Sequence, residues 1–302
     1  MAILLNGKHK GVQVWYDSLK TIDEILDIRL LDNIGNPDEI DFIISWGFKK
    51  GFFDQFKNLQ VICSVGAGID HILRDDSIKD EIKIVKIVDD KLTNSMWEYC
   101  LSAVTNYVMR FDIYEKQQKQ NLWKPYFPKS FSNTTIGVVG IGSIGGEVAR
   151  NFTRLGFNVK GYANSKKNLE GVDTYSKVDG IDSFLEDVDI VIGILPLTPD
   201  TKEFYNKKFF NSMKKGSVLI NVGRGAQIQE DDLIKSLANN HLRGAMLDVF
   251  KKEPLPEDSP LWDHPKTNIT PHIASITNAK SVAPQIIENY NNMIKRNPLN
   301  NL

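Results

Sequence analysis

Three polar residues in the second half of the chain could perform chemistry together. Arg224 follows the apolar run VLINVG, Glu253 follows LDVFKK, and His272 follows NITP. A guanidinium can bind a planar carboxylate through two parallel hydrogen bonds and polarise a keto oxygen beside it. A histidine can donate the proton that this oxygen needs after hydride transfer, and a neighbouring carboxylate favours the protonated histidine. Together they could reduce a 2-keto acid, although spacing alone shows no contact and a loop histidine is more often simply hydrogen-bonded.

A glycine-rich turn indicates where the hydride carrier would bind. The sequence TTIGVVGIGSIGGEVARNFTRL opens with an apolar, β-branched run, turns at Gly140, Gly142 and Gly145, and continues with apolar residues at helical spacing. This order is typical of a dinucleotide-binding βαβ unit, in which the glycines allow a sharp turn, approach to a pyrophosphate and close packing of the helix on the strand. The helix N-terminus, with Ser143 and Ile144, would face the phosphates. Taken alone, the pattern could also be an ordinary glycine-rich turn.

The segment after the next expected strand predicts which dinucleotide is used. NAD-binding folds place an acidic residue about 20 positions beyond the glycines, where it accepts a hydrogen bond from the ribose 2′-OH. The corresponding segment, GYANSKKN, offers Asn164, Ser165, Lys166 and Lys167 and no carboxylate. Amide, hydroxyl and ammonium donors would bind a 2′-phosphate, which a carboxylate would repel. We therefore predict NADPH in preference to NADH; the alternative is that both lysines only face solvent.

The elements that must position these residues alternate between strands and helices. In the first part of the chain we expect strands at 3–5, 28–31, 42–45, 60–64 and 83–88, with helices near 18–25 and 51–56. Such alternation implies a parallel sheet covered on both faces. The stretch SVGAGIDHI places Gly66 and Gly68 at the carboxyl edge of that sheet, where ligands usually bind, although a simple turn into a helix fits the spacing equally well.

The second part of the chain repeats this alternation. Ser95 and Glu98 form a capping-box pattern, which predicts a long helix from there to the loop NLWKPYFPKS. Further strands are expected at 158–162 and within 189–201, 217–225, 242–250 and 268–275, with a helix at 230–238.

These elements predict an α/β fold with two doubly wound parallel-sheet domains and a cleft between them. The first is a substrate domain, residues 1–100, completed by the C-terminal tail 275–302. The second, residues 101–274, is a Rossmann dinucleotide-binding domain.

The composition argues against several classes of binding partner for this protein. The net charge of −1 over 302 residues provides no basic field for nucleic acid or an anionic membrane, and we expect neither as a partner. Cys63 and Cys100 lie in apolar surroundings without metal-ligand spacing, so we expect reduced core thiols and no metal site. The opening MAILLNGKHK is apolar too briefly for a signal peptide or a membrane span, so we expect a cytoplasmic protein.

Six segments, in this order, resemble the D-isomer-specific 2-hydroxyacid dehydrogenase family: SVGAGIDH, GVVGIGSIG, LPLTPDT, INVGRG, LDVFKKEPLPEDSPLW and ITPHIAS. The likeness runs from about Val61 to Ser275. Four more segments, MWEYC, RFDIY, NLWKP and SKK, most resemble the glyoxylate/hydroxypyruvate reductase A branch of that family, although arginine is commoner than lysine in the last segment there.

The resemblance implies roles for individual residues. Arg224, Glu253 and His272 would be catalytic, and backbone N–H groups around Val65, Gly66 and Ala67 would hold the substrate carboxylate, with Arg224 as a further substrate contact. Asp248 would lie near the nicotinamide carboxamide, or else cap a loop at its strand end. The residues predicted to bind the cofactor are then Gly140, Gly142, Ser143, Ile144, Gly145, Asn164, Ser165, Lys166, Lys167, Pro196 and Asp248.

Two tryptophans have open interpretations. Trp46 follows the apolar run FIIS and could form a wall of the substrate pocket, or it could pack in the core. Trp123, in NLWKPYF, could reach the site of a neighbouring subunit in a homodimer, as the resemblance suggests, or it could pack its own loop.

We therefore predict an oxidoreductase that reduces a small 2-keto acid, of the glyoxylate or hydroxypyruvate type, to the D-2-hydroxy acid with NADPH. One alternative is a D-lactate-like or bulkier 2-ketoacid dehydrogenase on the same scaffold. The alternative from another class is an NAD(P)-responsive binding protein that resembles the family's corepressors.

Overall fold

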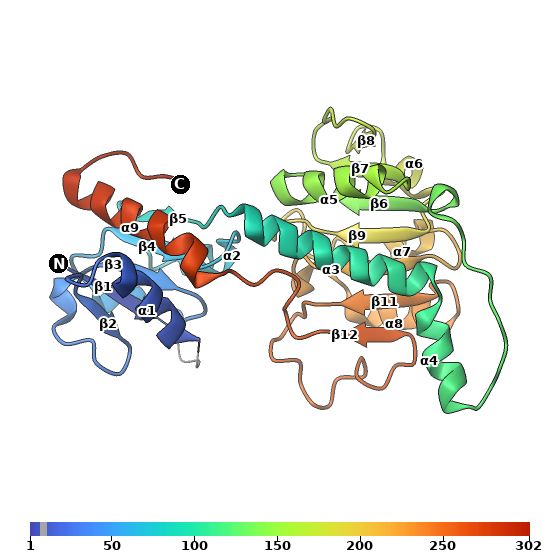
Figure 1. The fold of residues 1–302 in the computed structure, drawn as a ribbon, viewed down its shortest axis with the longest axis horizontal. Helices are drawn as coiled ribbons and strands as arrows, with labels where there is room; N and C mark the ends of the chain where they lie inside the picture. The colour runs from blue at the N-terminus through green and yellow to red at the C-terminus, as the bar shows by residue number, and fades with distance from the viewer. Residues whose placement is uncertain (7–10) are drawn as a thin grey trace. The chain divides into compact units, whose positions relative to one another are not determined.

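The computed structural model describes residues 1–6 and 11–302, which form two compact units (Figure 1). Unit 1 consists of Met1–Leu92 and Ile276–Leu302, and unit 2 consists of Thr93–Ser275. Each unit contains a parallel sheet with helices on both faces, which confirms the predicted fold class. Residues 7–10, in the polar part of the opening segment, lie outside the described residues.

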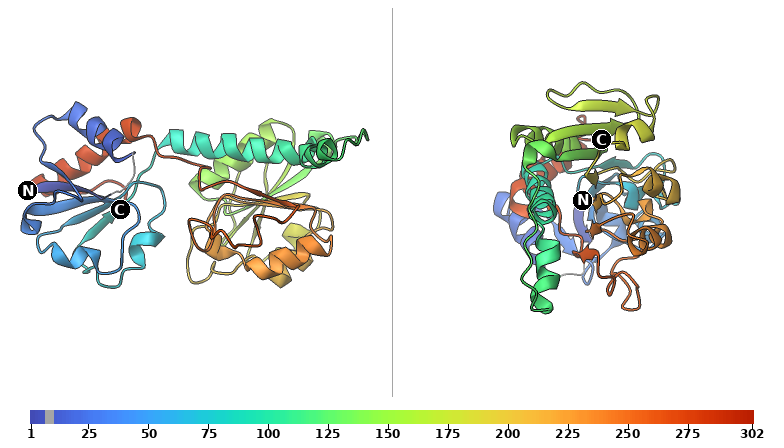
Figure 2. Two further views of the ribbon diagram at one scale, coloured as in Figure 1. Left: turned by 90° about the horizontal axis from the view of Figure 1, so that it is seen from below. Right: turned by 90° about the vertical axis from the view of Figure 1, so that its right-hand side faces the viewer.

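The sheet of unit 1 has the strand order β2-β1-β3-β4-β5, and all its pairings are parallel. The strands are β1 (Ala2–Asn6), β2 (Ile28–Leu30), β3 (Ile40–Ser45), β4 (Val61–Ser64) and β5 (Lys83–Val85). One face packs against α1 (Val12–Ile22) and α9 (Ala279–Lys295). The other packs against the 3₁₀ turn η2 (Phe52–Gln55) and the short helix α2 (Asp70–Leu73), and a further 3₁₀ turn, η1 (Pro37–Glu39), precedes β3 (Figure 2). Because both faces are covered, β1, β3 and β4 are buried along their whole length.

The expected strands of unit 1 are present, but two of its expected helices and the end of one strand differ clearly from the structure. The first helix is Val12–Ile22 rather than 18–25, and the segment near 51–56 is only a 3₁₀ turn. The strand expected to reach residue 88 ends at Val85. It ends there because the next two backbone N–H groups, of Lys86 and Ile87, donate to Asn301 and Gly66 instead of continuing a strand ladder.

The sheet of unit 2 has seven parallel strands in the order β12-β11-β10-β9-β6-β7-β8. Its strands are β6 (Thr135–Val139), β7 (Asn158–Ala163), β8 (Asp173–Ser176), β9 (Ile190–Gly193), β10 (Val218–Asn221), β11 (Gly244–Leu247) and β12 (Thr267–Ile269). The order reverses between β6 and β9, and such a switch point is where doubly wound sheets bind their ligands.

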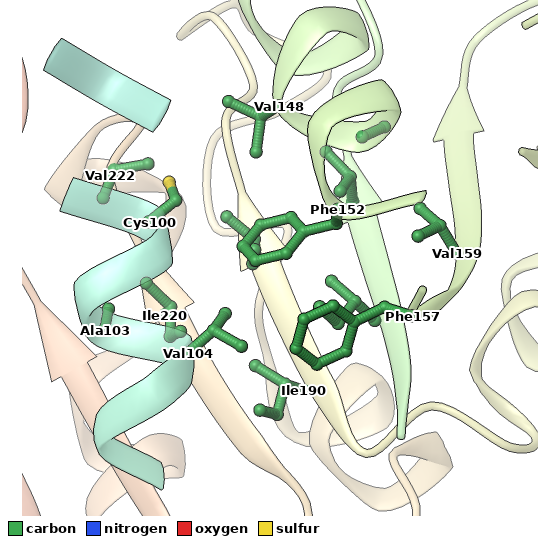
Figure 3. Packing of buried hydrophobic residues seen from close by; sticks show 14 of the residues in the cluster. Cys100, Ala103, Val104, Val148, Phe152, Phe157, Val159, Ile190, Ile220 and Val222 are labelled. Atoms are coloured by element: carbon green, nitrogen blue, oxygen red, sulfur yellow. The ribbon is translucent and has the colours of Figure 1, made fainter. Parts of the chain in front are cut away.

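Helices cover both faces of this sheet (Figure 2). One face packs against α3 (Asp90–Val108) and α5 (Ser143–Arg154), and the other against α6 (Ile181–Leu185), α7 (Lys207–Ser212) and α8 (Glu230–Ala238). Figure 3 shows Cys100, Ala103 and Val104 of α3 facing the strands. Two 3₁₀ turns, η3 (Phe131–Asn133) and η4 (Gly225–Gln227), precede β6 and α8.

The long helix predicted from Ser95 is two helices, and it begins earlier. α3 starts at Asp90, where the Asp89 carboxylate accepts the backbone N–H of Lys91 in the manner of an N-cap. The predicted capping box therefore lies inside the helix. α3 ends at Val108 because Arg110 has φ +66°, in the left-handed region, and α4 (Phe111–Lys119) follows.

The last strand is also shorter than the sequence predicts. β12 ends at Ile269, because Pro271 has no N–H to donate and the following N–H groups donate to Asp248. Among the strands and α-helices of unit 2, β8, α6 and α7 had not been predicted.

Within residues 1–6 and 11–302, no helix is both long and apolar enough to cross a bilayer. In the same residues, no group of three or more His, Cys, Asp and Glu side chains has an arrangement suited to a metal ion.

Candidate active site

The three predicted catalytic residues follow three neighbouring strands of unit 2. Arg224 follows β10, Glu253 follows β11 and His272 follows β12. These strands are adjacent and parallel, so their carboxyl ends share one edge of the sheet. The topology thus brings together residues that are widely separated in the sequence.

Glu253 and His272 form a direct hydrogen-bonded pair. The His272 Nδ1 lies 2.7 Å from the Glu253 Oε2, and the other carboxylate oxygen accepts the Phe250 N–H at 2.9 Å. Burial alone would raise the pKa of Glu253, but the hydrogen bonds from His272 and Phe250, with the charges of His272 and Arg224, hold it below its ordinary value. Glu253 is therefore an anionic acceptor near neutral pH, and the His272 Nδ1 carries the proton that it accepts.

Arg224 lies on a turn that packs against the same segment. A Cβ on Gly225 would lie 1.9 Å from the carbonyl carbon of Phe250, so only glycine allows this approach. Phe250 is also the residue whose N–H holds Glu253. The Arg224 Nη1 donates to the Gly223 carbonyl oxygen at 2.8 Å, and its charge acts on Glu253. The structure therefore brings all three predicted catalytic residues to one edge.

Gln227 is a site residue that the sequence did not reveal. Its buried side chain donates to the carbonyl oxygens of Leu195 and Pro196 at 3.0 and 2.9 Å, and it accepts the Arg224 N–H at 3.0 Å. Gln227 thus ties the arginine turn to the segment that contains the predicted cofactor contact Pro196. Only its contact with the Arg224 N–H is local, in the manner of a capping box. Its contacts with Leu195 and Pro196, which lie 32 and 31 positions away in the sequence, follow no local pattern.

Asp248 anchors the loop that carries His272. It is 1 % exposed, and its carboxylate accepts the N–H groups of Ile273 and Ala274, both at 2.8 Å. Its backbone oxygen accepts the His272 N–H at 2.8 Å, and the Thr270 hydroxyl donates to the carboxylate at 2.7 Å. The loop-capping alternative considered for Asp248 describes these contacts, while its role near the nicotinamide stays a prediction.

The glycine-rich turn at β6 has the geometry that a dinucleotide requires. Gly140 has φ +104°, and a Cβ on Gly145 would lie 2.1 Å from the Gly140 carbonyl oxygen. Gly142 is the N-cap of α5. Apart from its two neighbours in the chain and the backbone of its own helix, no atom of the described residues would lie within 4 Å of a Cβ at this position. The N-terminus of α5, with Ser143 and Ile144, can therefore be approached closely at its backbone, which fits a bound pyrophosphate.

The segment predicted to select the dinucleotide follows β7, the strand next to β6. Asn164, Ser165, Lys166 and Lys167 are all exposed. The Lys167 carbonyl oxygen accepts the Thr174 hydroxyl at 2.6 Å, which holds the backbone of the segment. Four exposed donors beside the glycine-rich turn fit a 2′-phosphate.

Unit 1 carries the predicted substrate loop after β4. The Val65 N–H donates to Ser45 at 3.3 Å, and Ala67 is partly exposed. Trp46 follows the neighbouring strand β3, and a Cβ on Gly66 would lie 3.0 Å from its ring. Trp46 is 41 % exposed, so this ring packs on the loop rather than in the core.

Comparison with known proteins identifies the family. The family model of the NAD-binding domain of D-isomer specific 2-hydroxyacid dehydrogenases matches residues 101–274. The chain is 36 % identical to glyoxylate/hydroxypyruvate reductase A of Serratia proteamaculans over 260 residues, which cover 84 % of this chain and 83 % of that protein. The corresponding enzyme of Escherichia fergusonii is 31 % identical over 270 residues, 88 % of this chain and 86 % of that protein.

Two solved structures extend the comparison. A D-isomer specific 2-hydroxyacid dehydrogenase from Xanthobacter autotrophicus, in complex with NADPH and MES, has a TM-score of 0.92 and 32 % identity, covering 99 % of this chain and 96 % of that one. An NADPH-dependent glyoxylate/hydroxypyruvate reductase from Sinorhizobium meliloti, in complex with NADP and sulfate, has a TM-score of 0.92 and 29 % identity, covering 100 % and 98 %. The resemblance predicted from the sequence motifs is confirmed: this chain belongs to the D-isomer-specific 2-hydroxyacid dehydrogenase family, in its glyoxylate/hydroxypyruvate reductase A branch.

Proposed function

We propose that this protein reduces small 2-keto acids to D-2-hydroxy acids with NADPH, and that glyoxylate and hydroxypyruvate are its first substrates to test. The observation that carries the proposal is the 2.7 Å pair of His272 and Glu253 on the sheet edge that also holds Arg224. Relatives named as glyoxylate/hydroxypyruvate reductases, one of them solved with NADP, support the substrate class and the cofactor.

Each catalytic residue has a distinct task in this proposal. Glu253 accepts the His272 Nδ1 proton, so Nε2 is the ring nitrogen that can pass a proton to the keto oxygen. Arg224 binds the substrate carboxylate and polarises the keto group. In unit 1, the loop at 65–67 is proposed to hold a carboxylate, for which the Val65 and Gly66 N–H groups would have to leave the Ser45 carbonyl oxygen and the Ser64 hydroxyl to which they donate in this structure. The Trp46 ring restricts the room beside Gly66.

NADPH, when bound, supplies the hydride that reaches carbon 2 of the keto acid. Gly140, Gly142 and Gly145, with the first turn of α5, would hold its pyrophosphate. Asn164, Ser165, Lys166 and Lys167 would hold its 2′-phosphate.

The test is the oxidation of NADPH in the presence of a panel of 2-keto acids. Turnover that is fastest with glyoxylate or hydroxypyruvate supports the proposal, whereas a preference for pyruvate or bulkier acids favours the D-lactate-like alternative. A folded protein that binds NADPH and turns over none of them is a corepressor-like binding protein. Arg224→Ala should lose most turnover while NADPH binding persists, and retained turnover would refute the assignment of Arg224.

We also propose that the protein is a homodimer in the cytoplasm. Trp123 and Phe127 are 98 % and 92 % exposed in one loop, an amount of exposed aromatic surface typical of an interface. Cys63 and Cys100 are both free and buried, as is usual for proteins of a reducing compartment.

A further inference from the structure

The loop that carries His272 has a backbone conformation that must be held by other groups. His272 has φ +55°, in the left-handed region that residues other than glycine rarely adopt. Its N–H and those of Ile273 and Ala274 all donate to the single residue Asp248, each at 2.8 Å. The position of the His272 ring therefore depends on the position of Asp248.

Asp248 is in turn held by a hydroxyl from the same loop. The Thr270 Oγ1 donates to one carboxylate oxygen of Asp248 at 2.7 Å. The Tyr99 hydroxyl lies 2.6 Å from that same Oγ1. Thr270 has only one hydroxyl proton, which it gives to Asp248, so Tyr99 must donate and Thr270 accept. The order of donation is thus Tyr99 to Thr270 to the Asp248 carboxylate.

Tyr99 comes from an element that is well fixed. It lies on α3, next to Cys100, which is buried in the hydrophobic cluster between α3 and the sheet (Figure 3). Burial raises the pKa of the Tyr99 hydroxyl well above its ordinary value, so it keeps its proton at every pH at which the enzyme would work. Helix α3 therefore places the Tyr99 hydroxyl, which stays protonated, where it can donate a hydrogen bond to the loop that carries His272.

We propose that Tyr99 is a positioning residue for His272, which acts through Thr270 and Asp248 without touching the substrate. This inference rests on the proposed role of His272 as the proton donor. Without the Tyr99 hydroxyl, Thr270 could turn its own hydroxyl toward other acceptors, and the anchor of the 270–274 loop would loosen. A hydrogen bond of this kind contributes about 0.5 to 1.5 kcal/mol, so we expect an effect of about two- to tenfold on the proton-transfer step.

The decisive variant is Tyr99→Phe, with Tyr107→Phe as its matched control. Tyr107 lies two turns further along α3, and its buried hydroxyl accepts a hydrogen bond from Asn268 of β12 at 2.9 Å. Both changes delete one hydroxyl between the same helix and the same part of the sheet, but only Tyr99 connects to Asp248. Thermal unfolding should show a similar loss of stability in the two variants.

Two measurements distinguish positioning from general stability. Tyr99→Phe should lower kcat about two- to tenfold with the KM for NADPH unchanged. It should also accelerate hydrogen exchange at the amides of residues 272–274, which requires no activity. Tyr107→Phe should change neither, and equal effects of the two variants would overturn the proposal.

Variants of Thr270 test whether the hydrogen bonds run in the order Tyr99 to Thr270 to Asp248. Thr270→Ser keeps the hydroxyl and should behave as wild type, whereas Thr270→Val should reproduce Tyr99→Phe. The double variant Tyr99→Phe with Thr270→Val should be no worse than Thr270→Val alone, because both act through one path. Additive losses of kcat in the double variant would show that Tyr99 and Thr270 act independently, which would contradict this order of hydrogen bonds. If the wild-type protein oxidises NADPH with none of the 2-keto acids, the proposed function fails, but the exchange measurement still decides whether Tyr99 holds the loop.

Discussion

Glu253 is the residue through which the pH dependence of the site can be tested. Its pKa is held below the ordinary 4.5 in the folded protein, despite burial, mainly by the hydrogen bond from His272. A carboxylate with a lowered pKa contributes stability that is complete above the unfolded-state pKa and is lost as the pH falls through the folded-state pKa. Glu253→Gln removes this titration. Wild type should therefore unfold at a higher temperature than the variant at pH 7, and this difference should shrink below about pH 4.5.

The same variant should impair turnover at neutral pH. The neutral amide of glutamine is a weaker acceptor than a carboxylate for the proton on the His272 Nδ1, so kcat should fall by about tenfold or more, while NADPH binding measured by fluorescence stays unchanged. A variant with wild-type kcat and an unchanged pH profile would show that Glu253 only supports the loop.

Lys166 and Lys167 carry the prediction of cofactor preference at the residue scale. Replacing both with alanine should raise the KM for NADPH about tenfold and spare that for NADH, because only NADPH has the 2′-phosphate. The control is the exposed pair Lys207 and Lys208 at the start of α7, whose replacement removes the same charge elsewhere. An unchanged NADPH to NADH ratio in the first variant would refute the preference.

At the scale of the element, two glycines of the turn between β6 and α5 have different predicted roles, one in packing and one in NADPH binding. A Cβ on Gly145 would lie 2.1 Å from the Gly140 carbonyl oxygen, so Gly145→Ala should lower the melting temperature and the yield of folded protein. Gly142→Ala meets no such clash and should fold normally. It should nevertheless weaken NADPH binding about tenfold, because a methyl group would stand where the pyrophosphate must approach. If Gly142→Ala and wild type bind NADPH with equal affinity, the dinucleotide does not bind at this turn.

Elements that depend on local patterns could be predicted from the sequence. The glycine-rich turn, the buried strands and the helix Glu230–Ala238 follow from spacing within a few residues. The break at Arg110 could not be predicted, since the apolar spacing continues through it and only a backbone angle marks it. The strand β8 was missed because it is a short edge strand with a single buried residue, and it gives little hydrophobic signal.

The candidate site shows the same limit. The sequence identified Arg224, Glu253 and His272 because each follows an apolar run and matches a motif of the D-isomer-specific 2-hydroxyacid dehydrogenases. The parallel topology brings the ends of the strands that precede them to one edge of the sheet. The contacts that hold them were not predictable. Tyr99 lies 171 positions from Thr270, so no spacing rule connects the two residues. The assignment of substrate and dinucleotide to separate units stays a prediction.

At the scale of the whole molecule, the loop between α4 and η3 carries the prediction of assembly. Trp123 and Phe127 are almost fully exposed, and such aromatic side chains are typical of the buried centre of an interface. Replacing both with alanine should convert the proposed dimer to a monomer in light scattering. It should also raise the KM for the keto acid if Trp123 reaches a neighbouring subunit's site. The control is Trp262→Ala, which removes a half-exposed tryptophan from another loop. A double variant with the mass and KM of wild type would mean that these aromatic residues serve only their own loop.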